Sequence, residues 1–285
     1  MRIKKLFKNR YIVSEDGVWV RDMCQVSKKI DINNLYKKEK NIWLENEMKN
    51  LSKDKLDFTN DISIDNIIIC SDGYGWKNKQ KIIGNLPNSE VKIIGVNGSL
   101  SKWEMVGKNS EIQRVMNFYV VNNPYSDCIG YLPKNHNYYP NIVASIRTNP
   151  EFIRKYKNSV CFYKPSNDMD YSGPPGLIDL TLDDYRNPIC AAISFAYELN
   201  VKKLLLFCCD DSFEEKKSGA VELHNGLYQY PQQIMSQKII DNQLYWLKQN
   251  NVEIFDHSSG IKYKNAEYIS EDDIVSFFQR SVKNE

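Results

Sequence analysis

The chain has 285 residues, of which 42% are hydrophobic, and a formal net charge of +2 at pH 7. A chain of this size and composition can bury a large core, as one large domain or as a domain with a small addition. Its 38 basic and 36 acidic residues are interspersed, which argues against a dedicated nucleic-acid binder.

The seven cysteines form no C-x-x-C motif and no metal-ligand spacing, and their number is odd. This pattern favours free thiols in a reducing cytoplasm over a disulfide framework. The first residues, MRIKKLFKNRY, are basic and contain no apolar stretch, so we expect no signal peptide. No segment approaches the roughly 18 apolar residues of a membrane span. We therefore expect a cytoplasmic protein without a transmembrane segment.

The first sixty residues differ in pattern from the remainder. Residues 10–22 alternate around Asp16-Gly17, which predicts a β-hairpin. Leu44, Met48 and Leu51 then recur at helical spacing among many charged residues. We expect residues 1–60 to form a small N-terminal α+β appendage and residues 61–285 to form the main domain.

From residue 65 onward, short apolar runs alternate with helical patterns. Strands are predicted at 66–73, 91–99, 117–124, 141–146, 159–165, 202–209 and 252–260. Helices are predicted at 76–86, at 150–158, from 188 onward and at 231–250. Asn187 is a suitable cap for the third helix, and Pro188 suits its first position. The Ser, Gly, Pro and Asp content of residues 166–184 predicts a long loop.

Buried strands alternating with helices predict an α/β, Rossmann-like three-layer fold with a mostly parallel central sheet. In such sheets, ligands bind beyond the carboxyl ends of the strands, near the point where the strand order reverses. Small and polar residues follow most of the predicted strands, so this edge is the expected ligand site.

The turn after the first core strand contains Gly73 and Gly75. Glycines between a strand and a helix let main-chain N–H groups approach a phosphate. Asn78 occupies the position of the third glycine of a G-x-G-x-x-G motif, so the motif is incomplete. The alternative is a tight turn that needs positive φ.

Polar side chains at other strand and helix ends are further candidates for reading a nucleotide, although the same residue types also favour turns. The candidates are Asp72, Asn97, Gly98, Ser99, Asn122, Asn187 and Ser258.

Two adjacent aspartates, Asp210 and Asp211, follow the apolar run KKLLLFCC. They could hold Mg²⁺ against phosphates or accept from a ligand hydroxyl. The alternative is a helix cap, or a salt bridge to Lys216 or Lys217.

His224 lies between the acidic strand end and the last long predicted helix, and Tyr228 and Tyr230 follow it. A histidine suits a general base near neutral pH, and tyrosines can donate to a departing phosphate. The alternative for His224 is a solvated loop residue.

The stretch FAYELNVKKLLLFCCDD, with the glycine turn before it and the histidine and long helix after it, resembles a Rossmann-like superfamily with two branches. One comprises the MptE-like proteins, named after an archaeal 6-hydroxymethyl-7,8-dihydropterin pyrophosphokinase. The other comprises the sialyltransferases of glycosyltransferase family 42 and the motility-associated nonulosonate transferases. In this superfamily the strand ends in G-x-D, and the match places Asp211 at the aspartate with Cys209 at the glycine. The first-strand motif G-x-G-P-S-L is represented by SDGYGW, in which only Gly73 matches.

The resemblance implies a transferase that takes a nucleotide or nucleotide-sugar donor. We expect a glycosyltransferase using a CMP-type sugar and an unknown acceptor, with His224 as base and Asp211, Tyr228 and Tyr230 as further catalytic residues. One alternative is a pterin pyrophosphokinase-like enzyme, for which Asp210 and Asp211 would bind Mg²⁺ with ATP. The other is a nucleotide-binding protein without catalytic activity.

Overall fold

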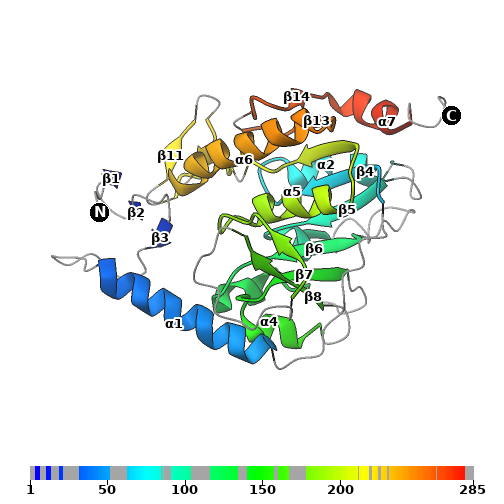
Figure 1. Ribbon diagram of the computed structural model, residues 1–285. Coiled ribbons are helices and arrows are strands. Elements are labelled where there is room, and N and C mark those ends of the chain that lie inside the picture. Colours follow the sequence, from blue (N-terminus) through cyan, green and yellow to red (C-terminus); the bar gives the residue numbers. More distant parts are fainter. Residues whose placement is uncertain are drawn as a thin grey trace.

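The protein is described here from a computed structural model (Figure 1). The structure describes residues 4–6, 11–13, 19–21, 32–51, 63–84, 86, 91–103, 116–133, 140–156, 160–166, 178–210, 212–217, 220–223, 226–229, 231–260 and 262–279.

A nine-stranded sheet forms the centre of the molecule, in the order β14-β13-β10-β4-β5-β6-β7-β8-β9, and every described pairing in it is parallel. The expected fold class is therefore confirmed. The strands are β4 (Asn66–Cys70), β5 (Val91–Gly95), β6 (Phe118–Val121), β7 (Asn141–Ser145), β8 (Val160–Pro165), β9 (Thr181–Leu182), β10 (Lys203–Phe207), β13 (Glu253–His257) and β14 (Glu267–Tyr268).

The strand order reverses once along the chain. From β4 the chain adds β5 to β9 on one side of β4, and it then returns to place β10, β13 and β14 on the other side. The switch point therefore lies where the loops after β4 and β10 diverge, which is the ligand position expected for a doubly wound sheet.

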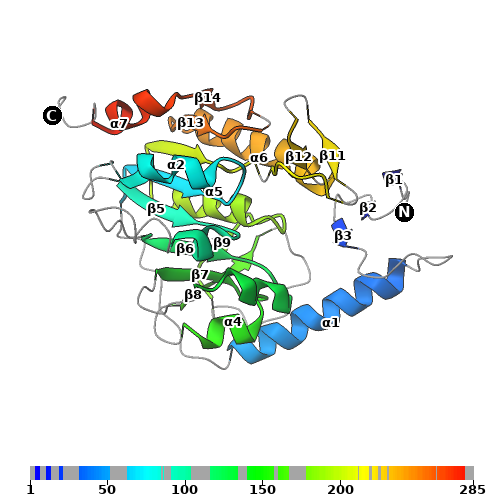
Figure 2. The ribbon, with the colours of Figure 1, turned by 180° about the vertical axis from the view of Figure 1, so that it is seen from behind.

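Helices cover both faces of the sheet and give it three layers (Figures 1 and 2). One face packs against α5 (Pro188–Glu198) and α6 (Pro231–Gln249). The other face packs against α2 (Trp76–Gly84), η1 (Ser126–Tyr131), α4 (Pro150–Arg154) and α7 (Glu271–Gln279). In the described part of the chain, no helix is long and apolar enough to cross a membrane.

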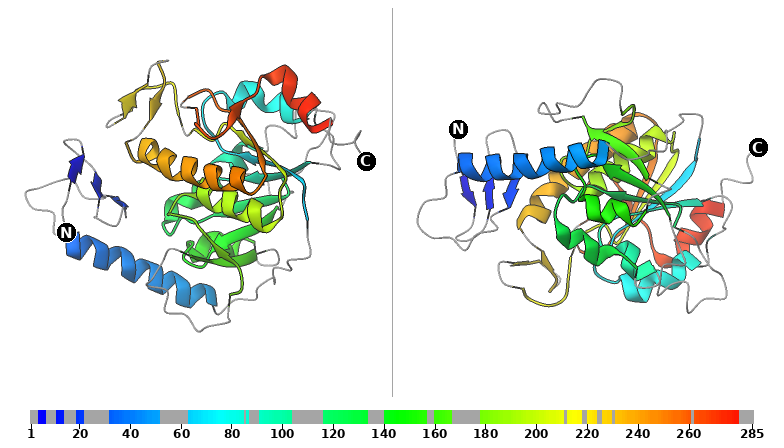
Figure 3. Two further views of the ribbon diagram at one scale, coloured as in Figure 1. Left: turned by 45° about the horizontal axis from the view of Figure 1, so that its top comes forward. Right: turned by 90° about the horizontal axis from the view of Figure 1, so that it is seen from below.

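The N-terminal region forms a separate three-stranded antiparallel sheet and a helix. β2 (Tyr11–Val13) pairs with β3 (Trp19–Arg21) as the expected hairpin, and β1 (Lys4–Leu6) adds to β2. Helix α1 (Ile32–Leu51) follows, and its N-terminal half extends beyond the main sheet (Figures 1 and 3). The division of the chain at residue 60 stays a prediction.

The predicted apolar stripe of α1 is only partly correct, because Met48 is 74% exposed. The buried residues of this helix include Trp43 and the polar Asn46, Glu47 and Asn50. Asn46 donates to the carbonyls of Pro124 and Arg147, and Asn50 donates to those of Ile146 and Thr148. The helix packs on main-chain carbonyls of the loops that follow β6 and β7, and burying these carbonyls requires hydrogen-bond donors rather than an apolar face.

Several shorter elements were not predicted. β9 lies within the stretch expected to be a loop, and η1, β14, α7 and the hairpin of β11 (Val221–Glu222) and β12 (Tyr228–Gln229) were missed. β9, β11, β12 and β14 are two residues long, which is too short for an alternating pattern to appear. The helix predicted at 150–158 is also shorter, since α4 ends at Arg154.

Candidate functional site

The loops after β4, β5, β10 and β13 meet at the switch point of the sheet. They bring together a group of charged and polar residues that we call the switch-point cluster: Asp72, Lys79, Lys102, Asp210, Asp256 and Ser258. The parallel register aligns the strand ends, with Cys70 opposite Gly95 on one side and opposite Phe207 on the other, and Phe207 opposite His257.

Gly73 is required by the packing of these loops. A Cβ atom there would lie 2.5 Å from the carbonyl oxygen of Cys208 and would also collide with the Asp210 carboxylate. The main-chain N–H of Gly73 donates to the same Cys208 carbonyl, at 3.1 Å. A larger residue at position 73 would therefore disturb the join between the β4 and β10 loops, with or without a ligand.

Two other glycines of this edge have equally local reasons. Gly75 has φ = +85°, which fits the alternative of a tight turn. A Cβ atom at Gly98 would collide with the carboxylate of Asp72. Neither the positive φ of Gly75 nor the close approach at Gly98 excludes a bound phosphate, because a phosphate would be bound by main-chain N–H groups of these turns.

Asp210 joins the loop after β10 to the loop after β13. Its Oδ2 accepts from the Ser212 hydroxyl at 2.6 Å and from the main-chain N–H of Gly260. Its Oδ1 is buried and has no hydrogen-bond partner among the described residues. Burial raises the pKa of this carboxyl, and the donors to Oδ2 oppose the rise.

Asp256 is a second buried carboxyl of the cluster. Ser258 donates to its Oδ1 from the hydroxyl at 2.6 Å and from the main-chain N–H at 3.1 Å. Its Oδ2 has no hydrogen-bond partner among the described residues. Burial, with a smaller contribution from the charge of Asp210, raises the pKa of Asp256 to about 6. Ser258 also accepts from the main-chain N–H of Cys209 at 3.1 Å. This hydrogen bond joins the loop after β13 to the loop after β10, so Ser258 has a structural role at the switch point.

Lys79 and Lys102 add positive charge to the cluster, and the sequence interpretation missed both. Each lies four residues after a glycine of a strand-end turn, and its main-chain N–H donates to the carbonyl of Gly75 or Gly98, respectively. The ammonium of Lys79 donates to the Ser259 hydroxyl at 2.8 Å and lies 3.5 Å from the carbonyl oxygen of His257. Lys102 contacts the carboxylate of Asp72 at 3.3 Å and donates to its carbonyl at 2.9 Å. The sequence signal that could have identified these two lysines is their position four residues after a glycine of a strand-end turn.

Asn97 and Ser99 follow β5, as predicted. Asn97 has φ = +53° and donates to the Ser71 hydroxyl at 3.2 Å, which fits the turn alternative. The hydroxyl of Ser99 is buried and has no partner among the described residues.

Asn122 and Asn187 lie in the other half of the sheet edge, with Asp184. The amide of Asn122 is close enough to lower the pKa of the Asp184 carboxyl, although burial raises that pKa overall. The side chain of Asn187 accepts from the main-chain N–H of Ile189 at 2.8 Å, so the predicted cap of α5 is confirmed. These two residues are not part of the switch-point cluster.

Of the predicted catalytic residues, Asp211, His224 and Tyr230 lie outside the described residues. Tyr228 is described and is half-buried in the hairpin of β11 and β12. It exchanges two main-chain hydrogen bonds with Phe213, at 2.8 and 3.0 Å, which places it beside the segment that follows β10. The side chain of Gln229 in the same hairpin donates to the carbonyl of Asp210.

The other chemical features of the described part are few. Six cysteines described by the structure are free thiols, as expected. No group of three or more His, Cys, Asp or Glu side chains in the described ranges could hold a metal ion. His257 is buried, with Nδ1 2.8 Å from the Ile269 carbonyl oxygen.

The fold and the switch-point cluster together define a Rossmann-like α/β protein whose polar groups gather at the usual ligand edge of the sheet. Neither a family model nor a curated protein matches the sequence. Among solved structures, the chain is similar to the MAf glycosyltransferase from Magnetospirillum magneticum AMB-1, with a TM-score of 0.63 and 13% sequence identity. The match covers 84% of this chain and 40% of that one. It shows a fold shared with a glycosyltransferase, whereas membership of the narrower MptE-like group stays a prediction.

Proposed function

We propose that the chain is a glycosyltransferase that binds a nucleotide-activated sugar, of the CMP type, at the switch-point cluster. The observation that carries this proposal is the position of Lys79. Its ammonium group donates to neutral oxygens, and no carboxylate lies within ion-pair distance of it in the described part of the chain. An ammonium at a ligand edge that has no acidic partner among the described residues suits the phosphate of a nucleotide donor.

The surroundings of Lys79 support the same ligand. Lys79 lies in the first turn of α2, where main-chain N–H groups and the helix dipole favour an anion. Lys102 approaches from the neighbouring strand end. Together with the turn at Gly73 and Gly75, these groups would bind the donor phosphate, and Asn97 and Ser99 would contact the nucleoside.

The catalytic roles rest on the resemblance and on the position of the hairpin. An acceptor hydroxyl must lose its proton as the glycosidic bond forms, and His224 would take that proton as general base. Tyr228 or Tyr230 would donate to the departing phosphate. The hydrogen bonds between Tyr228 and Phe213 support this role, because they hold the hairpin next to the end of β10.

The match to G-x-D also needs one adjustment, which we include in the proposal. Cys208 has φ = +54°, the left-handed conformation that glycine adopts most easily. The glycine of G-x-D therefore corresponds to Cys208 rather than Cys209, and its aspartate corresponds to Asp210. Asp210 would then present its unpartnered Oδ1 to the ligand, and Asp211 is the competing assignment.

A ligand screen tests the donor. Thermal unfolding is measured with CMP, UDP, GDP and ATP, each with and without Mg²⁺. A ligand at one hundred times its dissociation constant stabilises the folded state by about 2.7 kcal/mol. We expect CMP to stabilise the protein without Mg²⁺. Stabilisation by ATP only with Mg²⁺ would instead support the pyrophosphokinase alternative.

Matched variants test the site. Lys79→Gln should remove most of the stabilisation by CMP, whereas Lys81→Gln, an exposed lysine of the same helix, should keep it. His224→Ala should lower turnover by about a hundredfold or more while CMP still binds. Asp210→Asn should lower activity more than Asp211→Asn, and the reverse order would restore the original match. A protein that binds CMP but transfers no sugar would support the inactive alternative.

A further inference from the structure

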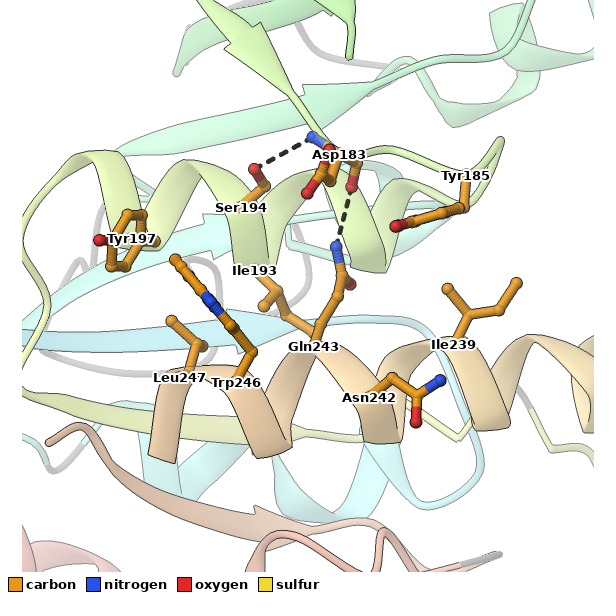
Figure 4. A pocket seen from close by; sticks show the side chains of 10 residues that line it. All are labelled: Asp183, Tyr185, Ile193, Ser194, Tyr197, Ile239, Asn242, Gln243, Trp246 and Leu247. Carbon is orange, nitrogen blue, oxygen red and sulfur yellow. Dashed lines mark hydrogen bonds between the residues drawn. The ribbon is translucent and has the colours of Figure 1, made fainter. Parts of the chain in front are cut away.

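A pocket of about 340 Å³ lies between α5 and α6, on the outer side of one helix layer (Figure 4). Its volume is at the lower end of the range for small-molecule sites, about 300–1,000 Å³. The switch-point cluster contributes none of its lining residues. The pocket therefore requires an explanation of its own.

Aromatic rings line both ends of the pocket. Tyr197 and Trp246 form a T-shaped pair at one end, with ring centroids 4.4 Å apart, and Tyr185 lies at the other end (Figure 4). Trp246 is 49% exposed, which is unusual for so large an apolar side chain away from an interface. These rings offer flat apolar faces that are accessible from solvent.

Two amide side chains, Asn242 and Gln243, line the pocket between the rings (Figure 4). The amide nitrogen of Gln243 donates to the carbonyls of Asp183 and Cys190, at 2.9 and 3.4 Å, and this fixes the side chain between α6, β9 and α5. Its Oε1 is buried and has no hydrogen-bond partner among the described residues. The amide of Asn242, one residue earlier, is exposed at the rim. Gln243 is thus held in one position at the pocket wall, and the exposed amide of Asn242 is a polar group that a ligand can reach.

The turn that carries Tyr185 has a strained main chain. Tyr185 and Arg186 have φ values of +43° and +59°, a conformation that residues other than glycine rarely adopt. Asp184 holds the turn by accepting from the main-chain N–H of Arg186 at 3.0 Å. Arg186 packs over the ring of Trp43 at 4.1 Å, and Tyr185 lines the pocket. Such strain is typical of sites where a side chain must be held in one position.

We propose that this pocket binds a neutral saccharide unit. Sugar rings present apolar C–H faces that pack on aromatic rings, and hydroxyl groups that pair with amide and carboxylate oxygens. Among the described residues, the lining includes the carboxylate of Asp183 and no Lys, Arg or His. This charge disfavours a nucleotide or an acidic sugar, so the pocket and the switch-point cluster select different ligands. The proposal does not depend on the proposed function, because a saccharide pocket needs no transferase activity.

Fluorine NMR of the full chain labelled with 5-fluorotryptophan tests the proposal. The sequence has five tryptophans, and Trp246→Phe identifies the resonance of Trp246 by its loss. The probes are the methyl glycosides of glucose, galactose, mannose, N-acetylglucosamine and N-acetylgalactosamine. We expect at least one to shift the Trp246 resonance saturably, and CMP and N-acetylneuraminic acid to leave it unchanged.

Two variants of α6 separate the pocket from the surrounding surface. Asn242→Ala should weaken binding by about threefold to tenfold, the usual effect of losing one neutral hydrogen bond. Tyr245→Ala is the matched control, because Tyr245 is 55% exposed on the same helix but does not line the pocket. The proposal is overturned if no neutral glycoside shifts the resonance up to its solubility limit. It is equally overturned if CMP or the acidic sugar shifts it as strongly, or if the two variants weaken binding alike.

Discussion

The carboxyl edge of the sheet has two halves whose buried aspartates differ in the use of their oxygens. Beyond β6 to β9, Asp184 accepts from the Tyr163 hydroxyl at 3.1 Å and from the main-chain N–H of Arg186 at 3.0 Å, one bond to each oxygen. At the switch point, Asp210 and Asp256 each keep one oxygen without a partner among the described residues. Burial raises the pKa of all three carboxyls, so burial is not what distinguishes them.

The half that contains Asp184 is also the half covered by α1. This helix packs over the loops beyond β6 and β7, where Asn46 and Asn50 satisfy four main-chain carbonyls. Glu47 pairs with the buried Arg147, and Glu39 accepts from Tyr125. Among the described residues, buried amide atoms without a partner also occur in this half, at Asn50 Oδ1 and Asn122 Nδ2, but buried carboxylate oxygens without a partner occur only at Asp210 and Asp256. A buried carboxylate is costly to leave unpaired, so the switch point is the better candidate for a ligand site.

The largest expected effect concerns the ion pair that closes the α1-covered half. Arg147 Nε lies 2.5 Å from Glu47 Oε1, and the two side chains are 8% and 4% exposed. Arg147→Met leaves Glu47 as an uncompensated buried charge and should lower the free energy of unfolding by about 3–5 kcal/mol. The control is Glu45→Gln, which breaks the exposed pair with Lys49 and should cost about 1 kcal/mol or less. Urea denaturation measures both, and equal losses would show that α1 does not depend on this pair.

The second prediction tests the unpaired half through pH. The pKa of Asp256 rises from 3.8 to about 6 on folding, so the folded state binds this proton more tightly than the unfolded state. The resulting stabilisation is fully present below about pH 4 and is lost as the pH rises through 6. The shift corresponds to about 3 kcal/mol. Asp256→Asn should remove this component, so the variant gains stability relative to the parent between pH 4 and 7. Identical pH curves in chemical denaturation would contradict the assignment.

The sequence predicted seven of the nine strands of the sheet because these seven are continuous apolar runs, whereas the two-residue strands β9 and β14 carry no such run. All five residues of β4, for example, are buried. Helix α5 begins at Pro188, as predicted from Asn187 as the cap and proline at the first position. The face of α1 was not predictable in the same way. Its contacts are amide groups on distant carbonyls, and the spacing of apolar residues does not report such contacts.

The site was only partly predictable for a related reason. Small and polar residues mark the ends of strands in the sequence. This pattern correctly predicted that Asp72, Gly98 and Ser258 lie at one edge of the sheet. Which polar atom stays unpaired depends on loops that are far apart in the sequence, as the contact of Asp210 with Gly260 shows. The roles of His224, Asp211 and Tyr230 stay predictions, since these residues lie outside the described ranges.

The third prediction concerns the join between the β4 and β10 loops at the switch point. Gly73→Ala would place a Cβ atom 2.5 Å from the carbonyl oxygen of Cys208, so a loop must shift. We expect a loss of about 1–3 kcal/mol in unfolding free energy, as for other overpacked sites. The matched variant is Gly130→Ala in η1, where no atom of the described residues lies within 4 Å of an added Cβ. Comparable stability of the two variants would mean that the join is looser than described, and Gly73 would again be explained best by a ligand.

The smallest expected effect separates the two halves by function as well as by stability. Asn187 caps α5 within the α1-covered half, and its main-chain N–H donates to the Asp184 carbonyl at 2.7 Å. Asn187→Ala should lower the unfolding free energy by about 1 kcal/mol, whereas Asn187→Asp should keep the cap and most of the stability. Because this half is closed by its own hydrogen bonds, neither variant should change the thermal stabilisation by CMP, in contrast to Lys79→Gln. If Asn187→Ala weakened CMP binding as strongly as Lys79→Gln while the fold stayed intact, the ligand would extend across both halves. The unpaired oxygens of Asp210 and Asp256 would then no longer be the feature that marks the site.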